Sequence, residues 1–132
     1  MEITWFGHSC FRINGKGATL ITDPCDKSLG YSMDKLAGDI VTISHRHLGH
    51  SYVEAVGGNP DGISSSIEYE IADILIDGIG TFHDAEHGRI RGKNTVYLME
   101  IDELKLCHLG DLGHILTPQQ LEELSNVEVL LL

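Results

Sequence analysis

The 132-residue chain is poor in basic residues, with 9 Lys and Arg against 20 Asp and Glu, and its formal net charge is −11. Such an acidic surface repels a phosphate backbone, so a nucleic-acid partner is not expected. The one basic cluster consists of Arg89, Arg91 and Lys93. It fits either a solvated loop or a contact for an anionic substrate.

Cysteines and long apolar runs are also scarce. Three Cys without paired spacing argue against a disulfide framework and for a reducing compartment. The first residues do not have the pattern of a signal peptide, and no run approaches the ~20 apolar residues of a membrane helix. We therefore expect a soluble, cytoplasmic protein. Its length and its hydrophobic content of 42% suit a single globular domain, residues 1–132.

Short β-rich runs separated by turn residues dominate the pattern. The predicted strands are 2–6, 10–13, 18–22, 39–43, 68–77, 79–82, 94–101, 104–109 and 127–132. Helices are predicted at 32–37, at 51–56 with Ser51 as the N-cap, and from Pro118, with Thr117 as its N-cap, to about 125. The remaining segments, including 59–66 and 84–92, are predicted loops. Many strands and few short helices indicate an α+β fold, with helices covering a sheet.

Three histidines, His45, His47 and His50, follow the apolar run 39–43 within six residues. On a helix, His45 and His47 would diverge, but on an extended segment residues two apart share a face. Imidazole suits zinc and the neighbouring transition metals, with bonds of about 2.0–2.1 Å. This spacing therefore favours a metal site over the alternative, a solvated polar loop.

His83 and Asp111 each follow another predicted strand. Loops at strand ends are where such folds often place their chemistry. Taken alone, His83 fits a surface residue equally well, and Asp111, between Gly110 and Gly113, fits a turn.

Five separated motifs occur in a characteristic order. They are Trp5-Phe6-Gly7-His8-Ser9, Thr22-Asp23-Pro24, Ser44-His45-x-His47-x-x-His50, Phe82-His83-Asp84 and Gly110-Asp111. This order resembles the metallo-β-lactamase-fold metal-dependent hydrolases, and in particular their small bacterial lactonase-like members. The resemblance implies an αββα sandwich, or the N-terminal half of one, with metal at one rim.

The resemblance also assigns metal ligands. His45, His47 and His83 match the three histidines of the first metal site. Asp111 matches the carboxylate that bridges two metals and orients the attacking water. No organic cofactor is implied, and the expected ion is Zn²⁺ or another divalent metal such as Mn²⁺, Fe²⁺ or Ni²⁺.

Further roles follow by the same matching. His50 matches a ligand of the second metal, Asp23 matches a residue that supports the histidine loop, and His8 lies near the substrate in similar proteins. Position 49 departs from the pattern, because Gly49 stands where the family has an Asp that binds the second metal. We therefore expect a weakened second site.

The implied activity is hydrolysis of a small ester, lactone or phosphodiester by a metal-activated water, with Asp111 and His8 as catalytic residues. The alternative is a catalytically impaired metal-binding or oligomeric remnant of the family. Similar proteins continue beyond the last predicted strand with a further ligand and half of the sandwich. The apolar run 127–132 would then form a bare edge, which predicts a homodimer.

Overall fold

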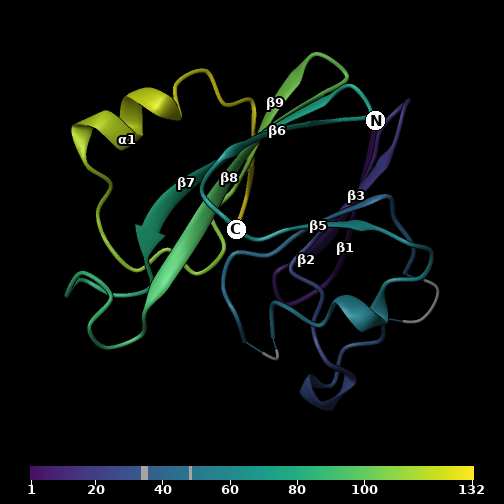
Figure 1. Cartoon of the computed structure of the whole chain (residues 1–132), viewed down its shortest axis with the longest axis horizontal. Helices are drawn as coiled ribbons and strands as arrows, with labels where there is room; N and C mark the ends of the chain where they lie inside the picture. Colours follow the sequence, from purple (N-terminus) through teal and green to yellow (C-terminus); the bar gives the residue numbers. More distant parts are fainter. Residues whose placement is uncertain (34–35, 48) are drawn as a thin grey trace.

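A computed structural model describes residues 1–33, 36–47 and 49–132, and it contains two five-stranded sheets that face each other (Figure 1). The first sheet has the order β1 (Glu2–Gly7), β2 (Cys10–Asn14), β3 (Thr19–Thr22), β4 (Ile40–Thr42) and β5 (Asp61–Ile63). The second has the order β10 (Val129–Leu131), β9 (Leu104–His108), β8 (Lys93–Ile101), β7 (Ile74–Phe82) and β6 (Glu68–Ile71). Two mixed sheets with few helices confirm the predicted fold class.

Helical structure among the described residues is limited to short pieces. They are the 3-10 turns η1 (Lys27–Leu29) and η2 (Val53–Ala55) and the helix α1 (Pro118–Glu123). Thr117 caps α1 in a capping box with Gln120, as its position before Pro118 predicted. None of these pieces is long and apolar enough to cross a membrane.

The helices predicted at 51–56 and 32–37 have different outcomes. The helix predicted at 51–56 is wrong in type, because only the single turn η2 forms there. Ser51 does not cap it, since its hydroxyl donates to the His47 carbonyl instead (2.9 Å). The helix predicted at 32–37 includes residues 34–35, which lie outside the described residues.

The break predicted at Gly78 is also wrong, because β7 runs straight through this residue. The hairpin turn instead lies at Ala72 and Asp73, whose φ values of 51° and 63° suit a type I′ turn. Gly78 allows a close approach of backbones, because a Cβ there would lie 2.4 Å from the Ser65 carbonyl oxygen. The Gly78 N–H donates to the Ile67 carbonyl (3.1 Å).

The segment 59–66, predicted as a loop, contains the short strand β5. It pairs in parallel with β4, with Val41 opposite Gly62. Gly and Asp weaken an isolated strand, so this segment owes its conformation to the pairing and not to its own propensity.

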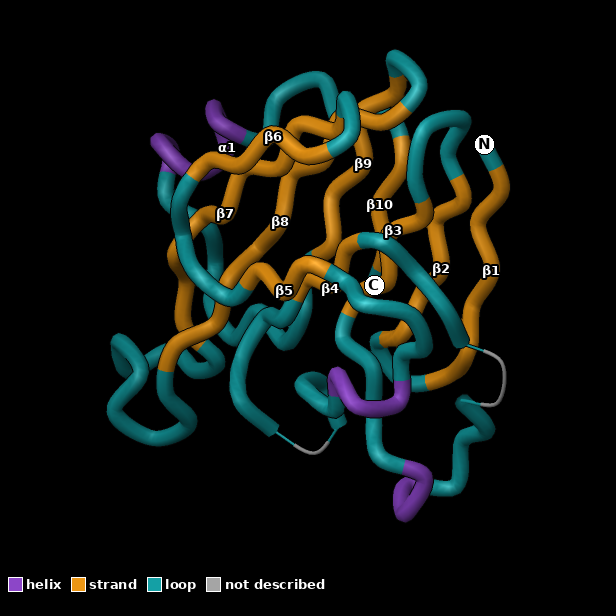
Figure 2. Tube along the Cα trace, turned by 45° about the vertical axis from the view of Figure 1, so that its right-hand side comes forward, coloured by secondary structure: helices purple, strands orange, loops and turns teal. Residues whose placement is uncertain are grey.

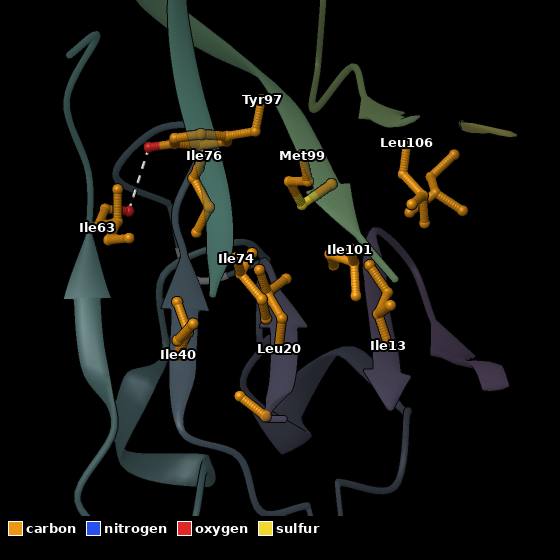
Figure 3. Packing of buried hydrophobic residues seen from close by; sticks show 12 residues of the cluster. Ile13, Leu20, Ile40, Ile63, Ile74, Ile76, Tyr97, Met99, Ile101 and Leu106 are labelled. Carbon is orange, nitrogen blue, oxygen red and sulfur yellow. Dashed lines mark hydrogen bonds between the residues drawn. The ribbon is translucent and has the colours of Figure 1, made fainter. Parts of the chain in front are cut away.

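The main core lies between the two sheets (Figure 3). Its largest members are Ile13, Leu20, Ile40 and Ile63 from the first sheet and Ile76, Tyr97, Met99, Ile101 and Leu106 from the second. Strands β3 and β4 are buried on both faces, because Ile21 and Val41 pack into a second cluster behind the first sheet. This explains why apolar residues stand next to each other in these strands, at Leu20-Ile21 and Ile40-Val41, and do not alternate with polar ones.

Tyr97 joins the two sheets at the end where the histidines emerge. Its hydroxyl donates to the carbonyls of Ile43 (2.8 Å) and Ile63 (3.1 Å). Figure 2 shows the loop after β4 and the loop between β7 and β8 at this same end of the sandwich. The predicted metal-binding loops therefore face one another across the sheet interface.

Candidate metal centre

The histidine loop starts where β4 ends and is held by Asp23. Asp23 follows β3, the parallel neighbour of β4, and its backbone N–H donates to the Thr42 carbonyl (2.9 Å). Its carboxylate accepts hydrogen bonds from the Ser44 N–H (2.7 Å) and the Ser44 hydroxyl (2.5 Å). The buried carboxylate thus fixes the first turn of the loop.

The same carboxylate orients His50. His50 Nδ1 lies 2.7 Å from Asp23 Oδ2, and both side chains are buried. A carboxylate at this distance holds a proton on Nδ1 and leaves Nε2 with a free lone pair, the form that a metal requires. Asp23 therefore has the supporting position that the family resemblance implied.

Asp111 is positioned by a residue that sequence reasoning missed. The buried Asn94 accepts the Asp111 N–H on its side-chain oxygen (3.0 Å) and donates to Thr81 Oγ1 (2.9 Å) and the Leu109 carbonyl (3.0 Å). Gly110 has a φ of 58°, and a Cβ there would lie 2.5 Å from Ser44 Cβ. Asn94 lies at the start of β8, as predicted, and no local pattern marks it as an anchor there.

Three imidazoles converge on one oxygen of Asp111. The distances to Asp111 Oδ2 are 2.9 Å from His83 Nε2, 3.0 Å from His50 Nε2 and 3.5 Å from His45 Nε2. Donors in a tetrahedral zinc site, about 2.0–2.1 Å from the ion, stand about 3.3 Å apart. Donor atoms of His45, His50 and Asp111 all lie within 4.8 Å of one another. His45, His50 and Asp111 therefore have the spacing of a transition-metal site, and His83 adjoins them through Asp111.

The protonation state of His45 suits a ligand. Burial, followed by the neighbouring His50, lowers the pKa of His45 to about 4, although the Asp111 carboxylate opposes the shift. The ring is therefore neutral at pH 7 and binds a metal without first losing a proton. The Ser44 hydroxyl lies 3.0 Å from His45 Nδ1, which leaves Nε2 facing Asp111.

His83 begins a loop that Asp84 holds in place. The Asp84 carboxylate accepts hydrogen bonds from the backbone N–H groups of Glu86, Gly88, Ile90 and Arg91. These bonds, led by that of Arg91, lower the pKa of Asp84 to about 2, so it is ionised at pH 7. The His83 N–H closes the loop on the Gly92 carbonyl (3.0 Å).

His47 lies at the edge of this cluster. The segment is a bent loop, not the extended continuation of β4 that was predicted. The rings of His47 and His45 are nonetheless stacked, with centroids 6.0 Å apart. His47 Nδ1 accepts the Gly49 N–H (3.0 Å), and the ring is exposed. Its role as a ligand stays a prediction.

His8 packs its ring edge-on against that of His50, with ring centroids 4.7 Å apart. Its φ of 52° places it in a tight turn, which the Trp5 indole N–H fixes by donating to the His8 carbonyl (3.0 Å). The side chain thus lies beside the cluster, where the resemblance placed it, and its catalytic role stays a prediction.

Comparison with known proteins decides the family. The family model described as the β-lactamase superfamily domain matches residues 2–132. The chain belongs to this superfamily. A metallo-β-lactamase superfamily protein from Thermotoga maritima, described as a zinc-dependent hydrolase, is 41% identical to this chain, with a TM-score of 0.79.

Two curated relatives agree with this assignment. A UPF0173 protein of Pyrococcus abyssi is 31% identical over 84% of this chain, and a UPF0173 metal-dependent hydrolase of Thermoplasma volcanium is 25% identical over all of it. The matched region covers 60% of the length of the Pyrococcus protein and 70% of the length of the Thermoplasma protein. It covers 58% of the Thermotoga chain, while 97% of this chain takes part in that match.

Proposed function

We propose that this superfamily member is a metal-dependent hydrolase that acts on a small ester, lactone or phosphodiester. The observation that carries the proposal is the convergence of His45, His50 and His83 on Asp111 Oδ2. The relatives named as metal-dependent hydrolases support it.

The residues would divide the work as follows. His45, His50, His83 and Asp111 would hold the ion, with His47 completing the set from the loop edge. A divalent ion of this type lowers the pKa of a bound water and polarises the oxygen of a substrate carbonyl or phosphoryl group.

The protein's own groups would then handle orientation and protons. Asp111, whose side chain is 33% exposed, would accept a proton from the attacking water, and Asn94 keeps Asp111 in place through its N–H. His8, whose ring packs against that of His50 with centroids 4.7 Å apart, would donate a proton to the leaving group.

Zinc is the first ion to test, because three imidazoles and one carboxylate are its usual donors. Metal-depleted protein should take up zinc at pH 7, measured by competition with a chromophoric chelator. His83→Ala should weaken zinc binding about tenfold or more, whereas His87→Ala should not, since His87 lies in the same loop but outside the cluster. Failure to take up any divalent metal would overturn the proposal.

A catalytically impaired metal-binding protein is the second candidate, and Gly49 favours it by removing the carboxylate that the family uses for its second metal. Binding cannot separate the two candidates. Ester, lactone and phosphodiester substrates should be tested with metal-loaded protein and with metal-depleted protein as the control. Metal uptake without metal-dependent hydrolysis of any of them would favour the impaired form.

A further inference from the structure

The loop between His83 and Gly92 carries a positively charged side chain, that of Arg91, beside the proposed metal centre. A cavity of about 500 Å³ opens next to the cluster and is lined by His83, Asp84, Ile90, Arg91, Asp111, Leu112 and Gly113. Two of these residues, His83 and Asp111, belong to the proposed metal centre. A molecule bound in this cavity would therefore lie next to the proposed metal centre.

Arg91 is the charge in this cavity that is not already engaged. The carboxylate of Asp84 is occupied by four backbone N–H groups, and that of Asp111 faces the histidines. The Arg91 side chain is exposed, with no ion pair or hydrogen bond among the residues that the structure describes. Its neighbour Arg89, by contrast, lies 3.4 Å from Glu86.

The backbone that carries Arg91 is fixed. Its N–H donates to Asp84 Oδ2 (2.7 Å), as does that of Ile90 (3.0 Å). The His83–Gly92 hydrogen bond then holds this end of the loop against the proposed ligand His83. Such a loop presents its side chains at set positions, which lowers the entropy cost of binding.

The neighbouring side chain completes the site. Ile90 is 67% exposed and lines the same cavity, with Leu112 also on its wall. A large apolar side chain held in solvent beside an unpaired guanidinium suits a ligand with an apolar part and a negative group. In a chain of net charge −11, this local cation would offset the repulsion of an anion.

We propose that Arg91 is a specificity-determining residue that binds the carboxylate of a small, partly apolar substrate, such as a dicarboxylic acid monoester. The proposal rests on the hydrolase function proposed above, because it places the carboxylate in Arg91's reach while the ester group faces His83 and Asp111. Charge-assisted bonds from a guanidinium to a carboxylate are directional and strong enough to select such substrates.

The first test uses binding and not turnover. Hexanoate and the neutral 1-hexanol are titrated into zinc-loaded protein, and amide chemical shifts are followed by NMR. Arg91→Ala should weaken hexanoate binding about tenfold and leave 1-hexanol unaffected. Arg89→Ala, in the same loop but paired with Glu86, is the matched control. The Arg91 backbone bond to Asp84 survives the substitution, so the loop should keep its shape.

The second test uses a pair of substrates. The ratio of kcat/KM for 4-nitrophenyl hemisuccinate to that for 4-nitrophenyl butyrate should fall about tenfold in Arg91→Ala, through KM, and recover in part in Arg91→Lys. Equal hexanoate affinity in wild type and Arg91→Ala would overturn the proposal, as would an equal loss in Arg89→Ala or no binding to wild type. If Arg91-dependent binding occurs but neither ester is hydrolysed, the hydrolase function fails and the anion subsite stands.

Discussion

Gly49 is buried in contact with two histidines of the site. A Cβ at this position would lie 2.9 Å from His8 Cε1 and 3.1 Å from His47 Nδ1. A carboxylate introduced here would therefore enter the space between the two rings, where a second ion would need a donor. Because the neighbour is a side chain, His8 can yield by rotating.

Gly49→Asp should raise the number of bound zinc ions per chain from one toward two, measured by native mass spectrometry. His8→Ala/Gly49→Asp, in which the ring no longer competes for the space, should reach at least the same number. Because His50 already belongs to the first site, a second ion without this carboxylate would have only a share of Asp111, which is too few donors to hold it firmly. Two ions in the wild-type protein would refute this account of position 49.

The lowered pKa of His45 predicts how the metal-free protein responds to acid. The unfolded chain protonates His45 near pH 6.5, whereas the folded chain does so near pH 4, so the unfolded state binds more protons between these values. The contribution of His45 to stability is therefore complete above pH 6.5 and is lost as the pH falls toward 4. Urea unfolding at pH 7 and pH 5 should show this loss, and His45→Gln should reduce it.

The exposed His87 supplies the control for this measurement. His87→Gln should leave the decrease in unfolding free energy between pH 7 and pH 5 unchanged. An equal loss in His45→Gln and wild type would assign the acid sensitivity to other groups.

Sequence patterns predicted the candidate metal donors, but not the residue Asn94 that positions one of them. His45, His50, His83 and Asp111 were predicted as donors from spacing and motif, and the structure brings their side chains together. Asn94 was missed, because its partners Thr81 and Leu109 are distant in sequence and meet only when β7, β8 and β9 pair. Nothing local distinguishes such an anchor from any other polar residue.

The same limit applies to whole elements. The hairpins β2–β3 and β8–β9 were predictable from period and turn residues, and α1 from its cap, whereas the turn at Ala72 and Asp73 was missed. Strand β5 was not predictable, because it depends on pairing with β4. Gly78 was predicted to break the strand, but it lies within β7 at a point where the backbone of Ser65 passes close by. In both cases tertiary contacts override local propensity.

Strand β7 offers a matched pair of glycines to test this. Gly78→Ala would place a Cβ 2.4 Å from the Ser65 carbonyl oxygen, so the crossing segment must move. At Gly80 the nearest atom is 3.7 Å away, an ordinary contact. We expect Gly78→Ala to lower the free energy of unfolding by about 1–3 kcal/mol and Gly80→Ala to change it little, measured by urea denaturation. Equal effects would mean that the crossing does not require Gly78.

At the scale of the whole molecule, the open edge of the second sheet predicts self-association. Among the residues that the structure describes, strand β10 pairs with β9 alone, and Leu130 on it is 52% exposed. An exposed apolar edge strand readily pairs with another chain, so we propose a homodimer through β10. Light scattering at micromolar concentration should give twice the chain mass of 14.5 kDa.

A charged residue introduced into β10 tests whether this strand forms the dimer interface. Leu130→Lys should return the protein to a monomer, whereas Leu121→Lys, on the exposed face of α1, should not. A wild-type monomer, or a dimer that survives Leu130→Lys, would contradict an interface at β10.

The donors of the proposed metal centre come from both sheets: His45 and His50 follow β4, while His83 and Asp111 follow β7 and β9. An ion bound by all four would act as a cross-link between two layers that otherwise meet through apolar packing and a few bonds such as those of Tyr97. The layers could then separate only after the ion had left. Amide hydrogen exchange in β4 and β8 should therefore slow together on metal addition, so that two separately opening halves become one cooperative unit.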